Sequence, residues 1–398
     1  MKYILIRYGE LTLKGKNRNI FENQLLKNIK IQLQDYNLEI KKDRNRIYIN
    51  QVQEEYIQEI TNILKKIPGI HSFAIANICS TEIDVIKQNA LDLFDTSKPI
   101  FKIKVKRLNK DYPLNSNEIA KDVGAHILKT HDGLKDMKVK MKDVEQEVMI
   151  EIHRNNAYVY HKFIKGIGGL PIGTAGKAVV FLSGGIDSPV SAIMAMKRGL
   201  KVDLIHFSSP PYTTEDSLNK VKDLYRVLLK YDQDIKLYNV NIGVMQKQIN
   251  QNCRDSMQII ILRRMMVRFV DMYQEMFKAK AIVTGENLSQ VASQTLANMD
   301  VVNQTSNLLI LRPLLTYDKD EIIIKAKEYN TYDISIRPFA DCCVIFVPKA
   351  PITNAKVEVI NHEEERFDYS KILKEIEIQK ITKDDVKENN ILEKLIGR

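Results

Sequence analysis

Cysteine and long apolar runs are both scarce in this 398-residue sequence. A membrane-spanning helix needs about 20 consecutive, mostly apolar residues, and no segment offers them. The N-terminal MKYILIRYGE has only a short apolar stretch, interrupted by Arg7, so no secretory signal peptide is predicted. Four cysteines in a chain of this length do not form a disulfide framework. We therefore expect a protein of the reducing cytoplasm.

Low-complexity sequence is absent as well, and a hydrophobic fraction of 44% is ordinary for a folded protein. The length predicts two or three domains. Residues 1–170 carry 29 Lys and Arg against 21 Asp and Glu, a net charge of +8, whereas the remaining residues carry 31 against 29, a net charge of +2. This asymmetry indicates either a polyanion-binding module joined to a near-neutral catalytic one, or a lysine-rich solubilised surface.

The pattern of apolar residues divides the chain into three units. Residues 1–59 and 60–165 each read as a small α+β unit, and the segment 166–176 is a glycine-rich linker. Residues 177–398 alternate apolar strands with helices, which predicts an α/β domain with a doubly wound parallel sheet covered on both faces. The charged tail from about residue 370 is expected to be helical and solvated, or loosely docked.

One strand and two helix starts can be placed more closely. The segment IFKIKVKR alternates apolar residues with lysine, which predicts a strand with one buried and one basic face. Ser116 is the expected N-cap of the helix that follows it. Thr316 is the expected N-cap of a later helix with Asp318 and Lys319 in its first turn. A lysine there opposes the helix dipole, so we expect Lys319 to serve a ligand.

The segment AVVFLSGGIDSPVSAIMAMKRG is the most informative part of the chain. Its apolar start predicts a strand, SGG at 183–185 a tight turn, and Ser188 and Pro189 the start of a helix. This arrangement points several backbone N–H groups and a helix dipole at one spot, which favours a phosphate. The alternative is a generic glycine turn. There is no GxxxxGK[ST], so a kinase-type P-loop is excluded.

The sequence SGGIDS resembles the SGGxDS pattern of the PP-loop ATP pyrophosphatases, which adenylate a carbonyl oxygen of a substrate before a nucleophile displaces AMP. The resemblance implies that Ser183, Gly184, Gly185 and Ser188 cradle the phosphates of ATP. It also implies that Asp187 helps to organise Mg²⁺, with no metal site made by protein side chains alone.

Further residues are expected at the same site because they end or follow predicted strands, where ligands of α/β sheets bind. Those assigned to ATP are Phe181, Leu182, His206, Phe207, Arg263, Gly285 and Gln294. The adjacent Arg264 is expected to join them. Each of these alone would more often be structural, but together with the loop they favour one nucleotide site.

The whole chain to about residue 360 resembles the bacterial tRNA 4-thiouridine synthetases, or tRNA sulfurtransferases. The similar segments are RYGELTLKGKNRNIFE, GIGGLPIGTAGK, LSGGIDSPV, GENLSQVASQTLANM and LRPLLTYDKDEII. The resemblance implies an N-terminal ferredoxin-like domain, a THUMP domain and a PP-loop domain. It further implies that ATP activates O4 of uridine 8 in tRNA and that sulfur from a cysteine persulfide, supplied by a cysteine desulfurase, displaces AMP.

In that family the front domains hold tRNA, with THUMP on the acceptor end. The basic residues assigned to RNA phosphates are Lys14, Lys16, Arg18, Lys104, Lys106, Arg107 and Lys110. A solvated basic face is the alternative for any one of them. The resemblance also allows a homodimer in which one tRNA spans two subunits.

The adjacent Cys342 and Cys343 fall where the family carries its sulfur-transfer cysteine. We expect Cys342 to carry the sulfur and Cys343 to assist, and both to depend on a reactive thiolate. Cys79 and Cys253 lie in apolar surroundings and are expected to be inert core residues. Some members append a rhodanese-like domain with its own persulfide cysteine. The sequence ends at Arg398 with no such domain, which leaves a role in thiamin thiazole synthesis in doubt.

Three other functions remain open at this point. Another PP-loop tRNA modifier, such as a 2-thiouridylase or a lysidine-forming ligase, would have a similar loop but no need of this front half. A THUMP-type RNA-binding protein with a vestigial nucleotide site is disfavoured by the intact SGGIDS and Lys319. A THUMP methyltransferase would need a glycine-rich loop for S-adenosylmethionine, which the sequence does not offer.

Overall fold

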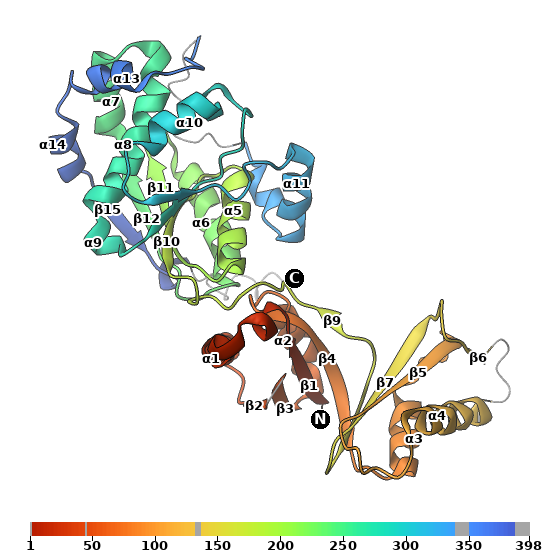
Figure 1. Cartoon of the computed structure of the whole chain (residues 1–398). Helices are drawn as coiled ribbons and strands as arrows, with labels where there is room; N and C mark the ends of the chain where they lie inside the picture. Colours follow the sequence, from red (N-terminus) through yellow and green to blue (C-terminus); the bar gives the residue numbers. More distant parts are fainter. Residues whose placement is uncertain (1, 44–45, 132–136, 339–349, 387–398) are drawn as a thin grey trace, which may run out of the picture. The chain divides into compact units, whose positions relative to one another are not determined.

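The computed structural model describes residues 2–43, 46–131, 137–338 and 350–386. They form two compact units, one ending at Pro171 and the other beginning at Ile172, drawn from red to yellow and from yellow-green to blue in Figure 1. The division falls inside the glycine-rich segment that the sequence marks as a linker. Among the described helices, none combines the length and apolar character that crossing a bilayer requires.

The first unit is built on one mixed sheet with the strand order β2-β3-β1-β4-β8-β7-β5-β6, and β9 beside β4 (Figure 1). Its strands are β1 (Lys2–Tyr8), β2 (Glu39–Asp43), β3 (Arg46–Val52), β4 (Ile70–Cys79), β5 (Ile100–Arg107), β6 (Lys138–Val139), β7 (Gln146–Ile152), β8 (Ala157–Tyr160) and β9 (Ile164–Lys165). Strand β4 pairs with β1 along its first part and with β8 at its end. The two halves of the unit therefore share one strand.

Each half of this sheet has its own core. Helices α1 (Arg18–Gln32) and α2 (Ile57–Leu64) pack on the half around β1. Helices α3 (Ile83–Asp92) and α4 (Ser116–Thr130) pack on the half around β5. The expected boundary after residue 59 falls inside α2, whose Ile60 and Leu64 are buried in the first core. The limits of the domains within this unit stay a prediction.

A buried carboxylate ties the two halves together. Glu151 of β7 is fully buried, and its oxygens accept hydrogen bonds from Arg46 on β3 at 2.5 and 2.8 Å and from Tyr160 on β8 at 2.7 Å. Arg7 of β1 lies 3.3 Å away. Burial by itself raises the pKa of Glu151, but His153, Arg46 and Tyr160 outweigh it and hold that pKa well below its usual range.

Two details of the first unit concern the predictions. Strand β5 has the two-faced pattern expected of it, with Phe101 and Ile103 buried and lysines at the alternate positions. The predicted N-cap of α4 was one residue off. Asn115, not Ser116, caps the helix, because its side chain accepts from the backbone N–H groups of Asn117 and Glu118. The Glu118 carboxylate in turn accepts from the backbone N–H of Asn115.

The second unit is the predicted α/β domain. Its sheet has the order β14-β13-β10-β11-β12-β15, parallel except for β15, which runs antiparallel to β12. The strands are β10 (Lys177–Phe181), β11 (Lys201–Ser208), β12 (Leu237–Asn241), β13 (Ala281–Val283), β14 (Leu309–Leu311) and β15 (Ile378–Ile381). In chain order the path runs outward from β10 through β11 to β12, then crosses back to β13 and β14. The strand order thus reverses between β10 and β13.

Helices cover both faces of this sheet (Figure 1). They are α5 (Asp187–Lys197), α6 (Glu215–Leu229), α7 (Gly243–Asn252), α8 (Gln258–Met272), α9 (Gln274–Phe277), α10 (Leu296–Asn303), α11 (Lys319–Glu328), α12 (Tyr332–Ser335), α13 (Val357–Glu364) and α14 (Tyr369–Lys374). The largest core lies between the sheet and α8, where Val179, Ile205 and Phe207 pack against Met266 and Phe269. Burial of these apolar side chains supplies most of the free energy that holds the helices on the sheet.

Two predictions for this unit were wrong. Helix α11 is capped by Asp318, not Thr316, because Asp318 and Glu321 form a reciprocal capping box. The segment after residue 370 begins in helix α14, as expected, but it is not loosely docked, because Leu373 and Ile381 are buried and β15 extends the sheet. The segment is rich in charged residues, but its apolar residues pack against the edge of the sheet. Residues 387–398 of the tail lie outside the described residues.

Candidate nucleotide site

The candidate site lies at the carboxyl ends of β10 and β13, where the strand order of the second unit reverses. Helices leave a parallel sheet on opposite faces at such a point, so a crevice opens between them and ligands bind there. The loop after β10 carries SGGIDS, and α5 starts directly after it at Asp187. The sequence therefore placed the loop correctly at the end of a strand and the start of a helix.

Two serine hydroxyls hold the loop in shape. The Ser188 hydroxyl accepts from the backbone N–H of Ser183 at 2.9 Å and donates to the Ser183 carbonyl at 3.1 Å. The Ser183 hydroxyl accepts from the backbone N–H of Gly185 at 3.2 Å. The turn is thus preorganised around the N-terminus of α5, whose dipole favours an anion.

Gly285 brings the end of β13 against this loop. A Cβ atom at position 285 would lie 2.8 Å from the backbone N of Ser188 and 3.0 Å from the carbonyl carbon of Asp187. Backbone atoms cannot swing aside as a flexible side chain can, so only glycine allows this approach. The strand end and the loop therefore form one continuous wall.

This wall lines a cavity of about 260 Å³. Eleven of the predicted nucleotide-binding residues line it, namely Phe181, Leu182, Ser183, Gly185, Asp187, Ser188, His206, Phe207, Arg263, Gly285 and Gln294. Gly184 belongs to the loop but is not a lining residue. The remaining lining comes from the apolar Ile205, Met266, Val267, Val302 and Ile310 and from the polar Thr284, Glu286 and Arg312. The cavity thus combines apolar side chains, which suit a flat aromatic group, with a few polar ones.

His206 is fixed by the loop itself. It is buried, and its Nδ1 lies 3.0 Å from the Leu182 carbonyl oxygen. A carbonyl only accepts hydrogen bonds, so Nδ1 carries a proton and the ring orientation is set. The adjacent Phe207 packs edge-on against Phe181 at 5.2 Å between ring centroids. The fixed side chains of His206, Phe207 and Phe181 therefore line the cavity at the ends of their strands.

Asp187 and Lys319 meet at the mouth of the site. Lys319 Nζ lies 2.6 Å from Asp187 Oδ1, and Gln290 Nε2 donates to Asp187 Oδ2 at 3.1 Å. Each of the two charged residues begins its helix, Asp187 α5 and Lys319 α11. The predicted ligand role of Lys319 is consistent with this position, although Lys319 is not itself a lining residue of the cavity. The side chain of Lys319 is 44% exposed, so it can reach solvent or a ligand.

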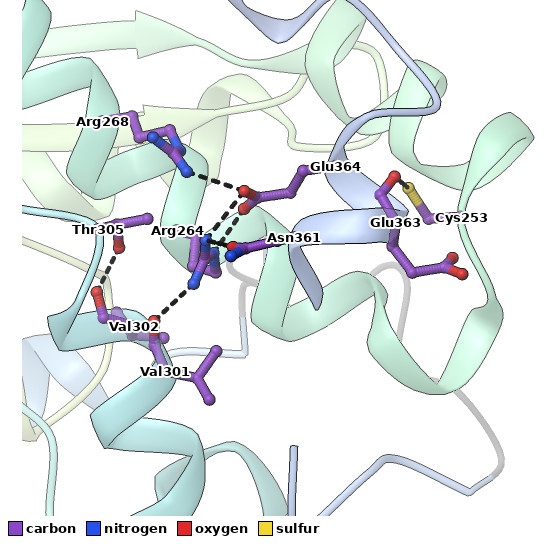
Figure 2. A network of polar contacts seen from close by, with 9 residues as sticks. All are labelled: Cys253, Arg264, Arg268, Val301, Val302, Thr305, Asn361, Glu363 and Glu364. Carbon is purple, nitrogen blue, oxygen red and sulfur yellow. Dashed lines mark hydrogen bonds and ion pairs between the residues drawn. The ribbon is translucent and has the colours of Figure 1, made fainter. Parts of the chain in front are cut away.

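The two adjacent arginines of α8 have different positions, and the expectation for Arg264 was wrong. Arg263 lines the cavity, whereas Arg264 is buried in a separate polar network shown in Figure 2. Arg264 donates to both oxygens of Glu364, to the Val301 carbonyl and to Asn361. Arg264 thus anchors α13 to α8 and α10.

Sequence reasoning missed two charged residues of the cavity. Glu286 follows β13 and Arg312 follows β14, and both line the pocket with Arg263. Arg312 Nε lies 2.7 Å from a Glu286 oxygen, and Arg263 bonds the other oxygen. Both residues stand just beyond the carboxyl ends of parallel strands. Their positions just after the predicted strands, in GENLSQ and LRPLL, could have identified both as residues of the site.

The basic residues assigned to RNA fall into two groups on the first unit. Lys16 and Arg18 line a polar hollow together with Lys42, and Lys14 lies over the Phe21 ring. Arg18 is also paired with the buried Glu22 at 2.6 Å. The hollow therefore carries three cations against the carboxylates of Glu22 and Asp43, a net charge of +1, which favours a polyanion.

The second group is more mixed. Lys106 and Lys110 are exposed. Lys104 pairs with Glu147 at 2.5 Å, and the Arg107 guanidinium donates to the carbonyls of Tyr112 and Leu114, each at 2.9 Å. Arg107 therefore holds its own loop in place, and the exposed lysines are the better candidates for contacts with RNA.

Comparison with known proteins agrees with this arrangement. Probable tRNA sulfurtransferases of Geobacillus kaustophilus and Macrococcus caseolyticus are 45% and 42% identical to this chain, over 93% and 94% of it and 92% and 93% of their own lengths. The chain belongs to the tRNA sulfurtransferase family.

Family models divide the chain in the same order as the fold. A ferredoxin-like domain model matches residues 3–74, a THUMP domain model matches 80–162, and the model described as thiamine biosynthesis protein (ThiI) matches 173–369. A solved 4-thiouridine synthetase in complex with RNA and bound ATP is 34% identical, with a TM-score of 0.88 over 96% of this chain and 100% of that one. A solved Pyrococcus horikoshii protein, PH1313, is 23% identical, with a TM-score of 0.63 over 83% of this chain and 100% of that one, and shares the fold.

The residues of the site also fit a magnesium ion that arrives with a nucleotide. Within the described ranges, no group of three or more His, Cys, Asp or Glu side chains is placed to hold a metal. Mg²⁺ needs only one or two carboxylates when substrate phosphates supply other oxygens. Asp187 stands beside the phosphate-type loop and is paired with one half-exposed lysine and with Gln290, whereas Glu286 is buried between two arginines. Asp187 is therefore the carboxylate that suits the ion.

The sulfur-transfer residues expected in this sulfurtransferase, Cys342 and Cys343, lie outside the described residues. Cys253 is buried and Cys79 half-buried. Burial raises the thiol pKa of each to about 11. A thiol with so high a pKa is almost wholly protonated near neutral pH and is a poor nucleophile. Both are consistent with the inert role expected of them.

Proposed function

We propose that this chain is an ATP-dependent tRNA sulfurtransferase that converts uridine 8 of tRNA to 4-thiouridine. In the proposed reaction, O4 of the uridine attacks the α-phosphorus of ATP and pyrophosphate leaves. Sulfur from a cysteine persulfide then attacks C4 and displaces AMP. The observation that carries the proposal is the SGGIDS loop at the reversal point of the sheet, in a chain whose solved relative holds both RNA and ATP.

We assign the residues of the cavity the following parts in this reaction. The loop residues Ser183, Gly184, Gly185 and Ser188 bind the phosphates through backbone N–H groups and hydroxyls. The apolar side, including Phe181 and Phe207, accepts the adenine ring. The remaining predicted residues, Leu182, His206, Arg263, Gly285 and Gln294, complete the walls around the ribose and phosphates.

Asp187 and Lys319 provide charge at the reacting phosphorus. When bound, Mg²⁺ neutralises phosphate oxygens and so favours attack at the α-phosphorus. Asp187 orients that ion, and Lys319, paired with Asp187 at 2.6 Å, can donate to the phosphate that bears the developing negative charge. The pair thus places one anion and one cation at the mouth of the phosphate loop.

The sulfur step falls to the adjacent cysteines. Cys342 receives the outer sulfur of a persulfide from a cysteine desulfurase, and that sulfur attacks C4 of the activated uridine as AMP leaves. Cys343 then attacks Cys342 at its sulfur, which releases the thiolated base and leaves a disulfide between the two cysteines. An external thiol must reduce that disulfide before the next turnover.

The first unit holds the tRNA near its acceptor end. Lys14, Lys16 and Arg18 around their hollow, and Lys106 and Lys110 on the other half, contact phosphates without reading sequence. Lys104 and Arg107 also belong to the proposed surface, although each has an internal partner. A homodimer, with one tRNA spanning two subunits, completes the proposal.

The test is a reconstituted reaction. The protein is incubated with Mg-ATP, tRNA, a cysteine desulfurase, cysteine and a thiol reductant, and both AMP and the absorbance band of 4-thiouridine are measured. We expect both products, and we expect Cys342→Ser to abolish thiolation and AMP release while pyrophosphate is still formed. AMP without thiolated tRNA from the unmodified protein would point to another PP-loop modification. Absence of AMP would favour an RNA-binding protein with a vestigial site.

A second proposal concerns thiamin, because the matching family model is described as a thiamine biosynthesis protein. We propose that the same persulfide chemistry supplies sulfur for the thiazole part of thiamin. Deletion of the gene should then create a requirement for thiazole that the intact chain removes. Growth of the deletion strain without thiazole would limit the protein to tRNA.

A further inference from the structure

Three residues of the second unit form a charged cluster on the wall of the cavity. The Glu286 side chain is only 9% exposed, and it bonds Arg263 through one oxygen and Arg312 and Thr284 through the other, at 2.7 and 3.0 Å. Arg263 comes from α8, Glu286 follows β13 and Arg312 follows β14. Residues from three separate elements therefore meet at one carboxylate.

Some polar atoms at this cluster have no hydrogen-bond partner among the described residues. Among the described contacts, Nη2 of Arg312 is buried and has no hydrogen-bond partner, and the same holds for Oε1 of Gln294. Both residues line the cavity, and Gln294 is only 7% exposed. A buried polar group without a partner is costly, so natural structures retain one mainly where something else binds it. Two residues of the cavity wall thus each carry a polar atom without a partner, a guanidinium nitrogen of Arg312 and the amide oxygen of Gln294.

The nearby Arg264 shows what a structural arginine looks like in this fold. All three of its guanidinium nitrogens are bonded, to Glu364, Val301 and Asn361 (Figure 2). Arg312 differs because one of its terminal nitrogens is left over at a cavity. An unpaired buried nitrogen also occurs away from the cavity, at Nε of Arg268, so it is the position of Arg312 in the cavity wall that points to a ligand.

Charge indicates what the cavity would take. Arg263 and Arg312 carry two positive charges against the single negative charge of Glu286, so the cluster presents a net charge of +1. Guanidinium groups bind phosphate oxygens more readily than neutral acceptors. The cluster also adjoins the phosphate loop, because Glu286 follows Gly285, whose Cα packs against the backbone of Ser188. A phosphate bound at that loop lies within the same cavity as the cluster.

We propose that Arg312 is a further ligand of the ATP phosphates, and that Glu286 is a positioning residue that holds Arg312 and Arg263 toward them. This inference rests on the proposed use of ATP. Glu286 holds Arg312 through Nε, and this leaves Nη2 without a partner in a residue that lines the cavity. Because Glu286 bonds both arginines at once, it also keeps the two cations from separating.

The test compares variants of the full chain for binding of Mg-ATP and of adenosine, which lacks phosphates, by titration calorimetry. We expect Arg312→Gln to weaken Mg-ATP by about tenfold or more, because a charge-assisted hydrogen bond is lost, and to leave adenosine binding unchanged. Arg312→Lys keeps the positive charge but not the planar guanidinium with its several N–H donors. It should therefore recover only part of the lost affinity for Mg-ATP. The matched control is Arg268→Gln, because Arg268 also lies on α8 and pairs with a carboxylate, Glu364, at 2.8 Å, but does not line the cavity.

Glu286 is tested by the kinetics of AMP release with tRNA. Glu286→Gln should lower the midpoint of thermal unfolding, because two arginines lose their counter-charge, but it should raise KM for ATP about tenfold and leave KM for tRNA unchanged. A loss of structure alone would lower the unfolding midpoint and affect both substrates together.

Three results would overturn the inference. The first is Mg-ATP binding by Arg312→Gln as tight as that of the unmodified chain. The second is equal weakening of adenosine and Mg-ATP, which would move the contact to the nucleoside. The third is an equal loss in Arg268→Gln. If the unmodified chain fails to bind Mg-ATP, the proposed function fails as well, and that outcome is distinct from the other three.

Discussion

Replacement of Gly285 by alanine tests the nucleotide site most directly. The new Cβ would lie 2.8 Å from the backbone N of Ser188, and ordinary contact begins at 3.4 Å, so the strand end and the loop must separate by about 0.6 Å. Overpacking of this kind costs about 1–3 kcal/mol of stability. The greater effect should be on function, because the displaced Ser188 and Asp187 belong to the phosphate loop.

We expect Gly285→Ala to lower kcat/KM for ATP about ten- to a hundredfold, because a misplacement of about 1 Å can cost a hundredfold in rate. The assay measures AMP release and Mg-ATP binding, with thermal unfolding recorded in parallel. The matched control is Gly124→Ala within α4, where the new Cβ meets nothing closer than 3.6 Å. Gly285→Ala with ordinary ATP binding and turnover would refute the claim that close backbone approach shapes the site.

The other predictions concern the core and the RNA surface. Glu151→Gln leaves Arg46 buried without its counter-charge and should cost about 3 kcal/mol of unfolding free energy. Because the pKa of Glu151 is lower in the folded state, its contribution to the free energy of unfolding is complete above the ordinary value near 4.5 and is lost as the pH falls below it. An unfolding midpoint of the unmodified chain that stays constant as the pH is lowered through this range would contradict this. Asn298→Ala removes hydrogen bonds to Ile352 and Ala355 and should cost about 1–3 kcal/mol, measured by denaturant unfolding. Lys106→Ala should reduce the slope of log binding constant against log salt concentration for tRNA by about one, without loss of stability. An unchanged slope would show that Lys106 does not contact RNA.

The sequence predicted the nucleotide loop and most of the cavity because both depend on local pattern. An apolar strand, a glycine turn and a helix start place the loop at a sheet edge wherever the strand lies. His206 and Gly285 could be added because parallel strands end at the same edge. Their conformations and partners, such as the bond from His206 to the Leu182 carbonyl, depend on the neighbouring strand and needed the structure.

The cluster around Glu286 could not be predicted, because it depends on strand order. Only the sequence β14-β13-β10 across the sheet brings Arg312 beside Glu286 and both beside the loop. The choice between Arg263 and Arg264 was also beyond the sequence. Consecutive residues of a helix point about 100° apart, and α8 is apolar around most of its circumference, so its pattern does not show which side faces the cavity.

The same reasoning explains why the segment after residue 370 was misjudged. Its many charges suggested a solvated helix, yet Ile378 and Ile381 belong to a strand at the sheet edge beside β12. An edge strand has one neighbour and an exposed flank, so it tolerates charged residues that a central strand would not. Composition alone does not separate these two cases.

The pair of Asp187 and Lys319 connects the architecture of the second unit to its chemistry. Two helix N-termini meet there, and an aspartate suits such a position whereas a lysine does not. The bond of 2.6 Å between the two side chains offsets the unfavourable placement of Lys319. A bound phosphate with Mg²⁺ would offer each partner a stronger opposite charge, Mg²⁺ for Asp187 and phosphate oxygen for Lys319. Under the proposed function, we expect the nucleotide to separate this ion pair, with the unfavourable position of Lys319 lowering the cost of that exchange.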